Sequence, residues 1–351
     1  MKKEEHHLFD YLVFIGRFQP FHLGHLALVK MALAQSKQVI MLIGSAEQPR
    51  STRNVFNFSE RAQMILAAFN AADAARISCV PLVDILYNDT RWVQAVEQAV
   101  ESVTGDNAAH RIGLIGHYKD KTSYYLSLFP NWSPVSVDSY QGISATPIRD
   151  PYLLGHLPTL DDVPVSTLTA LKQFAQTPDY QQLQEEAHYI VDYKKSWALA
   201  PYPSVFVTVD AVVVHSGHIL LIERGHLPGH GLYALPGGFL DQDETLFDAC
   251  LRELQEETKI KLSDSEWRIA YRAQRTFDEP HRSERGRTIT QGFYFELDEL
   301  LPLPQVHGGD DAKHAFWLSL SEVRSEHMFE DHYAIINALV NPEGIINRAV
   351  Y

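Results

Sequence analysis

The chain has 351 residues, of which 45% are apolar and 21% are charged, and this is the composition of an ordinary globular protein. At roughly 100–200 residues per domain, the length favours two domains. No stretch approaches the ~18 consecutive apolar residues of a membrane-spanning helix, so a membrane is not an expected partner. Two cysteines, Cys79 and Cys250, are too few for a disulfide framework. The expected compartment is the cytoplasm.

The net charge of −14 lies entirely in the second part of the chain. Residues 1–150 carry 14 basic and 14 acidic residues, whereas residues 151–351 carry 16 and 30. Phosphate contacts of a nucleic-acid-binding protein require cationic side chains, so nucleic acid is not an expected partner. An acidic half is better suited to binding cations, although a merely solvated acidic surface gives the same count.

The first part of the chain alternates between short apolar runs and helical patterns. Residues 11–16 form a continuous apolar run, which is typical of a buried parallel strand. Further strands are expected at 38–44, 77–83 and 112–116. Helices are expected at 24–36, from the capping box of Asn57 and Glu60 onward, and at 91–103. This order predicts a parallel α/β sheet, which binds its ligands at the carboxyl ends of the strands.

Two groups of prolines divide the chain. Residues 151–200 are bounded by prolines and contain a polar helical stretch at 166–199, so we expect a helical linker between domains at 1–150 and 201–351. The second domain is expected to be α+β, with a turn at Ser216 and Gly217. Its expected elements are strands at 204–215, 218–224, 267–277, 289–297 and 313–318, and helices at 245–258 and 329–340.

The first candidate site is the segment GRFQPFHLGH, which follows the first strand and begins the first helix. Gly16 allows the chain to turn, and Gly24 allows a ligand to approach the backbone closely. His22 and His25 are three residues apart, so both can face one side of the start of the helix. Backbone N–H groups there favour an anion. With Arg17 as a forked donor nearby, the segment predicts a polyphosphate site.

A second element, ISATPIR, lies at the end of the same domain. A Ser or Thr before a Pro is a good signal for the start of a helix. Ser144 and Thr146 would then bring a second helix N-terminus, together with Arg149, to the same phosphates. Taken alone, the pattern fits an ordinary helix cap equally well.

These segments resemble the nucleotidyltransferase superfamily, which carries a His-x-Gly-His signature and an Ile-Ser-x-Thr-x-x-Arg element. GRFQPFHLGH, IGSAEQPRSTRNVFNFSER and KDKTSYYLSLFPNW are similar to the archaeal-type nicotinamide mononucleotide (NMN) adenylyltransferases, over about residues 10–150. The resemblance implies a Rossmann-like parallel α/β domain. It also implies transfer of AMP from ATP to NMN, giving NAD and pyrophosphate, with Mg²⁺.

The resemblance implies a role for each matching residue. His22 and His25 would hold the ATP phosphates and stabilise the charge that develops as pyrophosphate leaves. Trp92 would stack on the nicotinamide ring, although an aromatic residue at the start of an amphipathic helix also fits a core position. The other nucleotide-binding residues are expected to be three phosphate-binding arginines, two hydroxyl residues and three residues of the first motif: Arg17, Arg53, Arg149, Ser144, Thr146, Gly16, Phe18 and Gly24.

The second candidate site begins at Gly238 and reads G-x5-E-x7-R-E-L-Q-E-E-T-K-I. It resembles the Nudix box, G-x5-E-x7-R-E-U-x-E-E-x-G-U, with one departure: Lys259 stands where the box has its second glycine. That glycine usually has a positive φ in the turn after the helix, so the lysine is expected to cause strain or to shift the turn. Every carboxylate of the box is present.

The carboxylates of the box are spaced to meet on one face of a helix. Glu253 and Glu257 are four residues apart, and Glu256 is three residues from Glu253, so their like charges destabilise the helix unless a hard divalent cation binds them. Arg252 is expected to pair with Glu244. The resemblance implies Mg²⁺ as the cofactor, with Mn²⁺ as the alternative. It implies that Glu256 and Glu257 are catalytic and that the metal ligands are Glu253, Glu256, Glu257 and Gly238.

The segment TFDEPHRSERGRTIT, residues 276–290, is similar to Nudix enzymes and regulators that handle ADP-ribose. The resemblance implies hydrolysis of ADP-ribose to AMP and ribose 5-phosphate. Arg282, Arg285 and Arg287 would contact phosphate or ribose, although a basic loop on an acidic domain explains them equally well. Over nearly its full length, except for the linker, the chain resembles the bifunctional NMN adenylyltransferase/Nudix hydrolases. That resemblance implies an α/β N-terminal domain and an α+β Nudix domain.

Three alternatives stay open at this point. The first site fits nicotinic acid mononucleotide as well as NMN. The second site fits another nucleoside diphosphate derivative, including a dinucleotide, as well as ADP-ribose. The third alternative is a second domain that senses ADP-ribose without cleaving it, but the intact carboxylates and the acidic residues after Leu320 favour an enzyme. The sequence does not indicate the oligomeric state.

Overall fold

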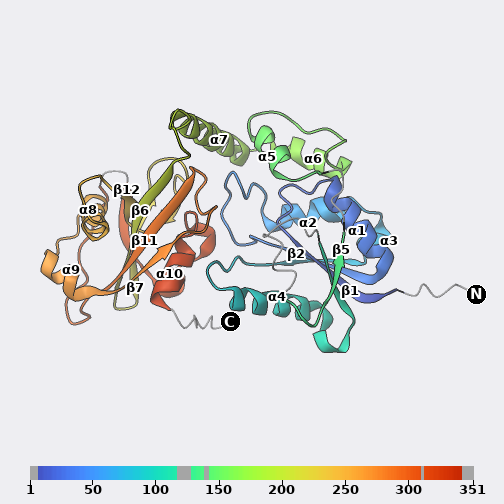
Figure 1. The fold of residues 1–351 in the computed structure, drawn as a ribbon, viewed down its shortest axis with the longest axis horizontal. Coiled ribbons are helices and arrows are strands. Elements are labelled where there is room, and N and C mark those ends of the chain that lie inside the picture. The colour runs from blue at the N-terminus through green and yellow to red at the C-terminus, as the bar shows by residue number, and fades with distance from the viewer. Residues whose placement is uncertain (1–6, 117–127, 138–141, 310–311, 342–351) are drawn as a thin grey trace, which may run out of the picture. The chain divides into compact units, whose positions relative to one another are not determined.

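The computed structural model describes residues 7–116, 128–137, 142–309 and 312–341. The chain divides into two compact units, Met1–Ala187 and His188–Tyr351 (Figure 1). Of the segment KDKTSYYLSLFPNW, residues 119–127 lie outside the described ranges. Within those ranges, none of the helices is both long and apolar enough to cross a membrane.

In the described part of the first unit, five parallel strands form a sheet in the order β3-β2-β1-β4-β5. They are β1 (Phe9–Gly16), β2 (Ser36–Ile43), β3 (Ile77–Pro81), β4 (Ile112–Gly116) and β5 (Ser133–Ser136). The strand order reverses between β1 and β4, and open α/β sheets bind ligands at the carboxyl ends of the strands at such a point. The predicted parallel sheet is confirmed, and β5 is a strand that was not predicted.

Helices cover both faces of this sheet. Leu12 and Phe14 pack against α1 (Leu23–Gln35) and α2 (Phe58–Leu66) on one face. Val13 packs with Val96 of α4 (Asp89–Thr104) on the other face. Because both faces of each strand are buried, the strands appear in the sequence as continuous apolar runs. The short helix α3 (Ala71–Ala74) and the 3₁₀ turn η1 (Asn107–Ala109) complete the connections between the strands.

The predicted capping box begins α2. The Asn57 side chain accepts the backbone N–H of Glu60 at 2.9 Å, and the Glu60 carboxylate accepts the backbone N–H of Asn57 at 2.8 Å. Each side chain thereby satisfies a backbone donor that the first turn of a helix leaves unpaired.

The segment after the sheet contains α5 (Thr146–Leu153), α6 (Val165–Phe174) and α7 (Pro178–Ser196). The helical stretch expected at 166–199 is therefore two helices. Thr177 interrupts it, because its hydroxyl accepts the backbone N–H of Tyr180 at 3.2 Å and so caps α7. Leu171 and Leu183 belong to the same core as α1 and α2, and the boundary between the two compact units falls within α7. The division into 1–150, 151–200 and 201–351 stays a prediction.

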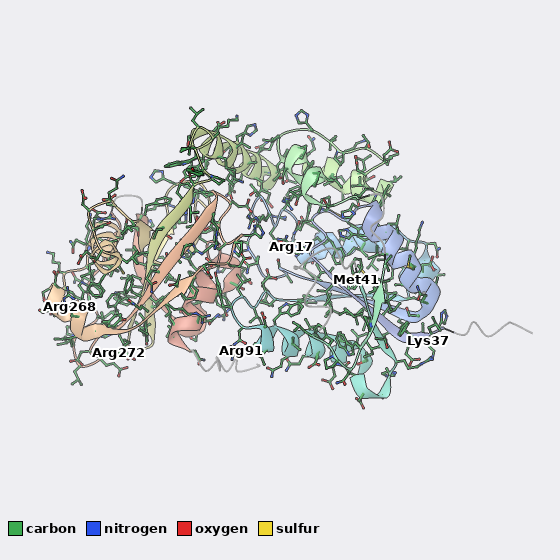
Figure 2. The ribbon with its side chains drawn as sticks, in the orientation of Figure 1. Arg17, Lys37, Met41, Arg91, Arg268 and Arg272 are labelled. Atoms are coloured by element: carbon green, nitrogen blue, oxygen red, sulfur yellow. The ribbon has the colours of Figure 1, made fainter. Side chains whose placement is uncertain are left out.

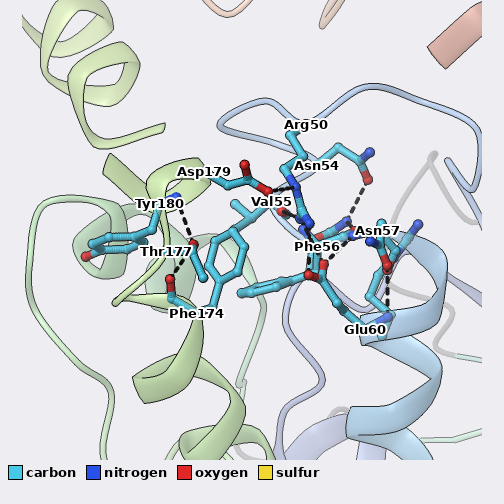
Figure 3. Close-up of polar contacts among 12 residues, drawn as sticks. Arg50, Asn54, Val55, Phe56, Asn57, Glu60, Phe174, Thr177, Asp179 and Tyr180 are labelled. Carbon is cyan, nitrogen blue, oxygen red and sulfur yellow. Dashed lines mark hydrogen bonds and ion pairs between the residues drawn. The ribbon is translucent and has the colours of Figure 1, made fainter. Parts of the chain in front are cut away.

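Arg50 joins this helical segment to the loop between β2 and α2 (Figure 3). Its Nη1 and Nη2 each donate to the Glu60 carboxylate at 2.8 Å, and its Nε lies 2.8 Å from Asp179. The guanidinium also lies over the Phe174 ring, 5.0 Å from its centroid. A planar, forked cation can make all of these contacts at once. The loop that carries Arg53 is therefore fixed at Arg50.

In the described part of the second unit, one mixed sheet has the main order β10-β11-β6-β7-β12, with β8 paired to β7 and β9 paired to β6. Ser216 and Gly217 join β6 and β7 with positive φ angles of 46° and 73°, as expected for a two-residue hairpin turn. The strands are β6 (Val205–His215), β7 (His218–Arg224), β8 (Tyr233–Ala234), β9 (Gly237–Phe239), β10 (Tyr271–Phe277), β11 (Arg287–Glu296) and β12 (Ala312–Ser319).

Helices also cover this sheet. Leu254 of α8 (Leu246–Thr258) packs into a core with Val209 and Phe295. Ile335 of α10 (His332–Val340) lies beside Gly292 of β11. The 3₁₀ turns η3 (Leu320–Glu322) and η4 (Ser325–His327) precede α10. The predicted combination of an α/β first unit and an α+β second unit is confirmed.

One predicted strand of the second unit was partly wrong. Residues 267–270, expected as the start of a strand, form the end of α9 (Asp264–Ala270), and only 271–277 are extended. The cause is a capping box, in which Ser263 accepts the backbone N–H of Glu266 and the Glu266 carboxylate accepts that of Ser263. Trp267 and Ala270 are buried on the inner face of this helix, which explains why they suggested a strand.

Candidate active sites

The two histidines of the first motif lie at the N-terminus of α1. Nδ1 of His22 accepts the backbone N–H of His25 at 3.4 Å, and Nδ1 of His25 accepts the backbone N–H of His22 at 3.3 Å. The rings are stacked, with centroids 3.6 Å apart. Because both Nδ1 atoms accept, the proton of each neutral ring lies on Nε2, and both rings can donate to an anion.

The glycines and Phe18 of the motif set the positions of these rings. A Cβ on Gly24 would lie 3.0 Å from Cε1 of His22, so glycine leaves room for that ring. A Cβ on Gly16 would lie 2.8 Å from the ring of Phe18, which is buried and packs edge-on against His25. These three residues therefore support the histidines. Their direct contact with a nucleotide stays a prediction.

The ISATPIR element begins α5 as predicted, but its hydroxyl groups do not cap the helix. Ala145 is the N-cap residue, Thr146 is the first helical residue, and the cap makes no side-chain hydrogen bond. Ser144 and Thr146 are both exposed. The expected helix start is confirmed, and the hydroxyl cap suggested by the sequence was wrong. Contact of Ser144 and Thr146 with phosphate stays a prediction.

A pocket of about 360 Å³ lies beside the start of α1. Ile143, Ser144 and Asp162 are among the residues that line it. The carbonyl oxygen of Asp162 accepts the backbone N–H of Leu23 at 3.0 Å, and that of Ile143 would lie 3.6 Å from a Cβ on Gly24. The second element therefore lines this pocket, and the start of α1 contacts two of the residues that line it.

Arg149 lies in the first turns of α5 and is buried. Its Nη2 donates to Asp150 at 3.0 Å. Its Nε is buried and has no hydrogen-bond partner among the residues that the structure describes. A buried donor without a partner costs free energy, so this nitrogen is suited to an anionic ligand.

Arg17 is exposed at the carboxyl end of β1, whereas Lys37, at the start of β2, lies toward the other end of the sheet (Figure 2). The backbone beside Arg17 is held by Arg61, which donates to the carbonyl oxygens of Arg17 at 2.8 Å, Gly44 at 2.6 Å and Ser45 at 3.1 Å. Burial lowers the pKa of Arg61 to about 10. Sequence reasoning missed Arg61, since an arginine on a polar helix carries no signal that it will be buried.

Arg53 is half-buried in the loop between β2 and α2. Next to it, Asn54 accepts a hydrogen bond from Nε2 of Gln19 at 2.6 Å, and the same Nε2 donates to the carbonyl oxygen of Phe56 at 2.7 Å. Gln19 belongs to the first motif. This contact therefore joins the loop of Arg53 to the first motif, and contact of Arg53 with a phosphate stays a prediction.

Trp92 lies in the first turns of α4 and packs against the core. Its ring centroid is 6.0 Å from that of Phe129, and it is one of the partly buried residues around Val96. This placement supports the core role that the sequence left open. Stacking of Trp92 on a nicotinamide ring stays a prediction.

The glycines of the second motif lie on β9, against the acidic helix α8. A Cβ on Gly238 would overlap the carboxylate of Glu253, and a Cβ on Gly237 would overlap the carbonyl oxygen of Val209. The backbone N–H of Gly237 donates to Oε2 of Glu257 at 2.9 Å. Both glycines are therefore required by close contacts, and they bring β9 directly against two carboxylates of the box.

Burial raises the pKa of two of these carboxylates. The Glu257 side chain is buried, and its desolvation raises the pKa to about 8. Burial also raises the pKa of Glu253. Glu253 already has the guanidinium of Arg252 beside it, whereas the only hydrogen bond described for the Glu257 carboxylate comes from the neutral N–H of Gly237. A buried carboxylate resists ionisation unless a positive charge is near, so Glu257 in particular is suited to a cation.

Arg252 pairs with Glu244 as predicted. Its Nη2 donates to Oε1 of Glu244 at 2.7 Å and its Nε to Oε2 at 3.0 Å. Nη1 is shared between Glu253 and Glu256, each at 2.9 Å, and Nη2 also donates to the carbonyl oxygen of Phe239. Arg252 therefore fixes the loop before α8 to the helix.

The metal ligands are not gathered in this conformation. In the described ranges, no group of three or more His, Cys, Asp or Glu side chains is arranged to hold a metal ion. Glu253 and Glu256 are both bonded to Arg252 instead. The donor chemistry nevertheless fits, because carboxylate and backbone carbonyl oxygens are the ligands that Mg²⁺ and Mn²⁺ prefer. Glu253, Glu256, Glu257 and Gly238 stay the predicted ligands.

Lys259 takes the conformation that the missing glycine would have. It is the C-cap residue of α8, with φ 52° and ψ 21° in the left-handed region. Its backbone N–H donates to the carbonyl oxygen of Gln255 at 3.2 Å. The expected strain is therefore present, and the turn keeps the glycine-like geometry.

A pocket of about 660 Å³ opens beside Glu257 and the two glycines of β9. Arg282 and Arg285 line it, but Arg287 does not; Arg287 donates to the carbonyl oxygen of Asp278. Sequence reasoning also missed Phe239, which is at a variable position of the box, and several lining residues that lie outside the box and form no motif: Tyr189, Tyr193, Asp210, Arg224, Glu330 and His332.

Arg282 is part of a buried charged network at this pocket. It forms two hydrogen bonds to Asp331, at 2.8 and 3.0 Å, and lies 3.8 Å from Asp210. Nδ1 of His332 accepts the backbone N–H of Leu235, and burial lowers its pKa to about 3. With its charge satisfied by Asp331, Arg282 is suited to a structural role, and Arg285 is the more available arginine for a substrate.

Comparison with known families agrees with this geometry. Residues 13–150 match the Cytidylyltransferase-like family, and residues 205–339 match the NUDIX domain family. A nicotinamide/nicotinic acid mononucleotide adenylyltransferase of Acinetobacter baylyi is 47% identical over 179 residues, which are 51% of this chain and 93% of that protein. An ADP-ribose pyrophosphatase of Methanocaldococcus jannaschii is 33% identical over 142 residues, which are 40% of this chain and 76% of that protein.

A solved structure extends the likeness over nearly the whole chain. The crystal structure of a bifunctional NMN adenylyltransferase/ADP ribose pyrophosphatase from Francisella tularensis, complexed with AMP and a manganese ion, has 39% sequence identity and a TM-score of 0.89. The likeness covers 96% of this chain and 100% of that one. This chain therefore belongs to the family of bifunctional NMN adenylyltransferase/ADP-ribose pyrophosphatases, in which a cytidylyltransferase-like domain precedes a Nudix domain.

Proposed function

We propose that this chain makes NAD from NMN and ATP at its first site and hydrolyses ADP-ribose at its second. The observation that carries the first activity is the stacked pair of His22 and His25 at the start of α1, where the strand order reverses. The observation that carries the second is the pocket shared by Glu257, the β9 glycines and Arg285. The names of the related proteins support both activities.

The first reaction requires no nucleophilic side chain. An oxygen of the NMN phosphate attacks the α-phosphorus of ATP, and the bond from that phosphorus to the bridging oxygen of pyrophosphate breaks. His22 and His25 donate Nε2–H to the phosphates, and Arg17, Arg53 and Arg149 add positive charge. Donors that are already in place before the reaction stabilise the developing charge without reorganising. We expect most of the rate enhancement to arise from this stabilisation.

The second reaction adds one water across the diphosphate of ADP-ribose and gives AMP and ribose 5-phosphate. Glu253, Glu256, Glu257 and the carbonyl oxygen of Gly238 would hold a divalent cation, Mg²⁺ or Mn²⁺, which when bound lowers the pKa of a water and neutralises phosphate charge. Glu257 lies beside the pocket. A cation bound there would favour its ionised form, in which it can accept a proton from the attacking water. Arg285 would contact the diphosphate.

Nicotinic acid mononucleotide is the second candidate substrate of the first site. The Acinetobacter baylyi relative is named for both mononucleotides. The two substrates differ in an amide or a carboxylate on the ring, so steady-state kinetics with each mononucleotide and ATP will give the preference. If the kcat/KM values for the two mononucleotides are nearly equal, the result would support use of both substrates.

Product assays on three proteins test the proposal: wild type, His22→Ala and Glu257→Gln. Each protein receives NMN with ATP and Mg²⁺, and separately ADP-ribose with Mg²⁺. We expect His22→Ala to lose only NAD synthesis and Glu257→Gln to lose only AMP release from ADP-ribose. Loss of both products in either variant that remains folded would contradict two independent sites. Intact ADP-ribose with wild type would contradict the hydrolase activity.

A further inference from the structure

The pocket of the second unit has an aromatic side that the Nudix motif does not supply. Tyr189 and Tyr193 line the pocket, and both come from α7. They precede residue 205, where the NUDIX match begins. Part of this pocket is therefore built by a helix that lies outside both family matches.

The aromatic residues form a continuous series from α7 to β9. The rings of Tyr189 and Tyr193 are four residues apart and stack at 6.3 Å, with an angle of 29° between their planes. Tyr193 packs against Phe206 at 5.9 Å, and Phe206 packs against Phe239 at 5.9 Å. Phe239 follows directly on the box glycines. Tyr189 is 38% exposed, so its ring is only partly covered by protein.

Arg285 adds a positive charge beside this aromatic series. Its guanidinium lies 5.2 Å from the centroid of the Phe239 ring. Its Nε is buried and has no hydrogen-bond partner in the part of the chain that the structure describes. A donor of this kind is suited to an anion, and it lines the same pocket as the two tyrosines and Glu257.

We propose that α7 provides the base-binding side of the Nudix pocket, with the adenine of ADP-ribose stacked on Tyr189 and Tyr193 and the diphosphate beside Arg285. Flat aromatic rings bind nucleobases through their faces, and a partly exposed tyrosine pair offers such a face. Glu257 and the β9 glycines then lie at the phosphates, where the bond is cleaved. The proposal rests on the proposed hydrolase function, since it places the base of that substrate.

Inhibition by the two products distinguishes binding of the base from binding of the rest of the substrate. AMP carries adenine, whereas ribose 5-phosphate does not. Both are tested as competitive inhibitors of ADP-ribose hydrolysis by the full chain. In Tyr189→Ala/Tyr193→Ala we expect about a 10-fold or larger rise in the KM for ADP-ribose and in the Ki of AMP. The Ki of ribose 5-phosphate and kcat should change less than about twofold.

Three controls accompany this variant. Tyr189→Phe/Tyr193→Phe keeps the rings and should retain the wild-type Ki of AMP. Tyr202→Ala removes an exposed tyrosine that does not line the pocket and should change neither constant. NAD synthesis should continue in every variant, which reports that the chain is folded. Equal rises in the Ki values of both products, or an unchanged Ki of AMP, would overturn the proposal.

Photolabelling tests the same placement without relying on hydrolysis. The full chain is irradiated with 8-azido-AMP, with and without ADP-ribose as competitor, and the labelled residue is identified by mass spectrometry. We expect label on Tyr189 or Tyr193 that ADP-ribose removes. Label within residues 205–339 and none on α7 would refute the base-binding role. If wild type leaves ADP-ribose intact but labels α7, the hydrolase proposal fails while the base-binding site stands.

Discussion

The backbone N–H of Gly237 donates to the Glu257 carboxylate at 2.9 Å, which joins β9 to the acidic helix α8. Glu257 is otherwise buried, and one neutral donor does not offset the loss of water around a carboxylate. The pKa of Glu257 is therefore raised to about 8. We therefore expect this single group to make the stability of the second domain depend on pH and on divalent cations.

In metal-free buffer, the second domain should lose stability as the pH rises from about 5 to 8. The folded-state pKa of Glu257 lies above its ordinary value of 4.5, so its contribution is fully present below pH 4.5 and is lost as the pH rises through about 8. The slope from one such group is at most about 1.4 kcal/mol per pH unit. Urea unfolding in EDTA at several pH values measures it.

Glu257→Gln is the matched control for this pH dependence, because it keeps the shape and removes the ionisation. The variant should be more stable than wild type at pH 9 and close to it at pH 5. Mg²⁺ should stabilise wild type most at high pH, where the carboxylate is ionised, and should stabilise the variant less. Identical pH profiles for the two proteins would show that Glu257 titrates normally.

Replacing His22 by Asn should separate its structural role from its chemical one. His22 is the N-cap of α1, and Asn is an effective N-cap, so His22→Asn should unfold close to wild type, whereas His22→Ala should lose about 1 kcal/mol. Both variants lack the imidazole, and both should lose NAD synthesis. Thermal unfolding and NAD formation measure the two effects. Substantial NAD synthesis by His22→Asn would show that the cap is what matters.

Replacing Lys259 by Gly should stabilise the second domain by about 0.5–1 kcal/mol. Lys259 has a φ of 52°, a conformation that glycine adopts without steric cost. Lys261→Gly makes the same chemical change at a residue without a positive φ and should not stabilise. Urea unfolding of both variants gives the comparison. A loss of stability in Lys259→Gly would mean that packing of the lysine stem outweighs the strain.

Replacing Arg252 by Lys should lower both the free energy of unfolding of the second domain and its hydrolase activity. A lysine cannot reproduce the two hydrogen bonds to Glu244 and the shared contact with Glu253, so we expect a loss of about 1–2 kcal/mol. The exposed pair of Arg272 and Glu296 serves as control, and Arg272→Lys should cost less than about 0.5 kcal/mol. Thermal unfolding and AMP release measure the outcome; equal effects of the two substitutions would contradict the role of Arg252.

The sequence predicted the parts of the fold that depend on local patterns. Buried parallel strands appear as apolar runs, and the capping box of Asn57 and the turn at Ser216 are local signals that the structure confirms. Residues 267–270 were wrongly predicted as a strand because of their aromatic and apolar pattern. The signal for a helix was also local, since Ser263 and Glu266 form a capping box. Strand β5 is short and mostly polar, so it carried no pattern to recognise.

The candidate sites were predictable where chemistry requires a fixed spacing, as in His22 and His25 or Glu253 and Glu257. Residues that reach the sites through tertiary contacts could not be predicted. Arg61 is a buried donor to three carbonyl oxygens of the loops after β1 and β2, and its sequence neighbours give no hint of this. Tyr189 and Tyr193 lie in a helix whose sequence predicts only a linker between domains, so nothing indicated that they would line a pocket.

Gly238 shows why the first glycine of the Nudix box cannot tolerate a side chain in this chain. Its Cα faces a carboxylate fifteen positions later, and any added carbon would occupy the space of Glu253. The absence of a side chain at Gly238 therefore determines where the Glu253 carboxylate lies, because only glycine allows that carboxylate to approach β9 this closely. A methyl group at this position would displace the Glu253 carboxylate, so a substitution at Gly238 would act on the same acid as a substitution of Glu253 itself.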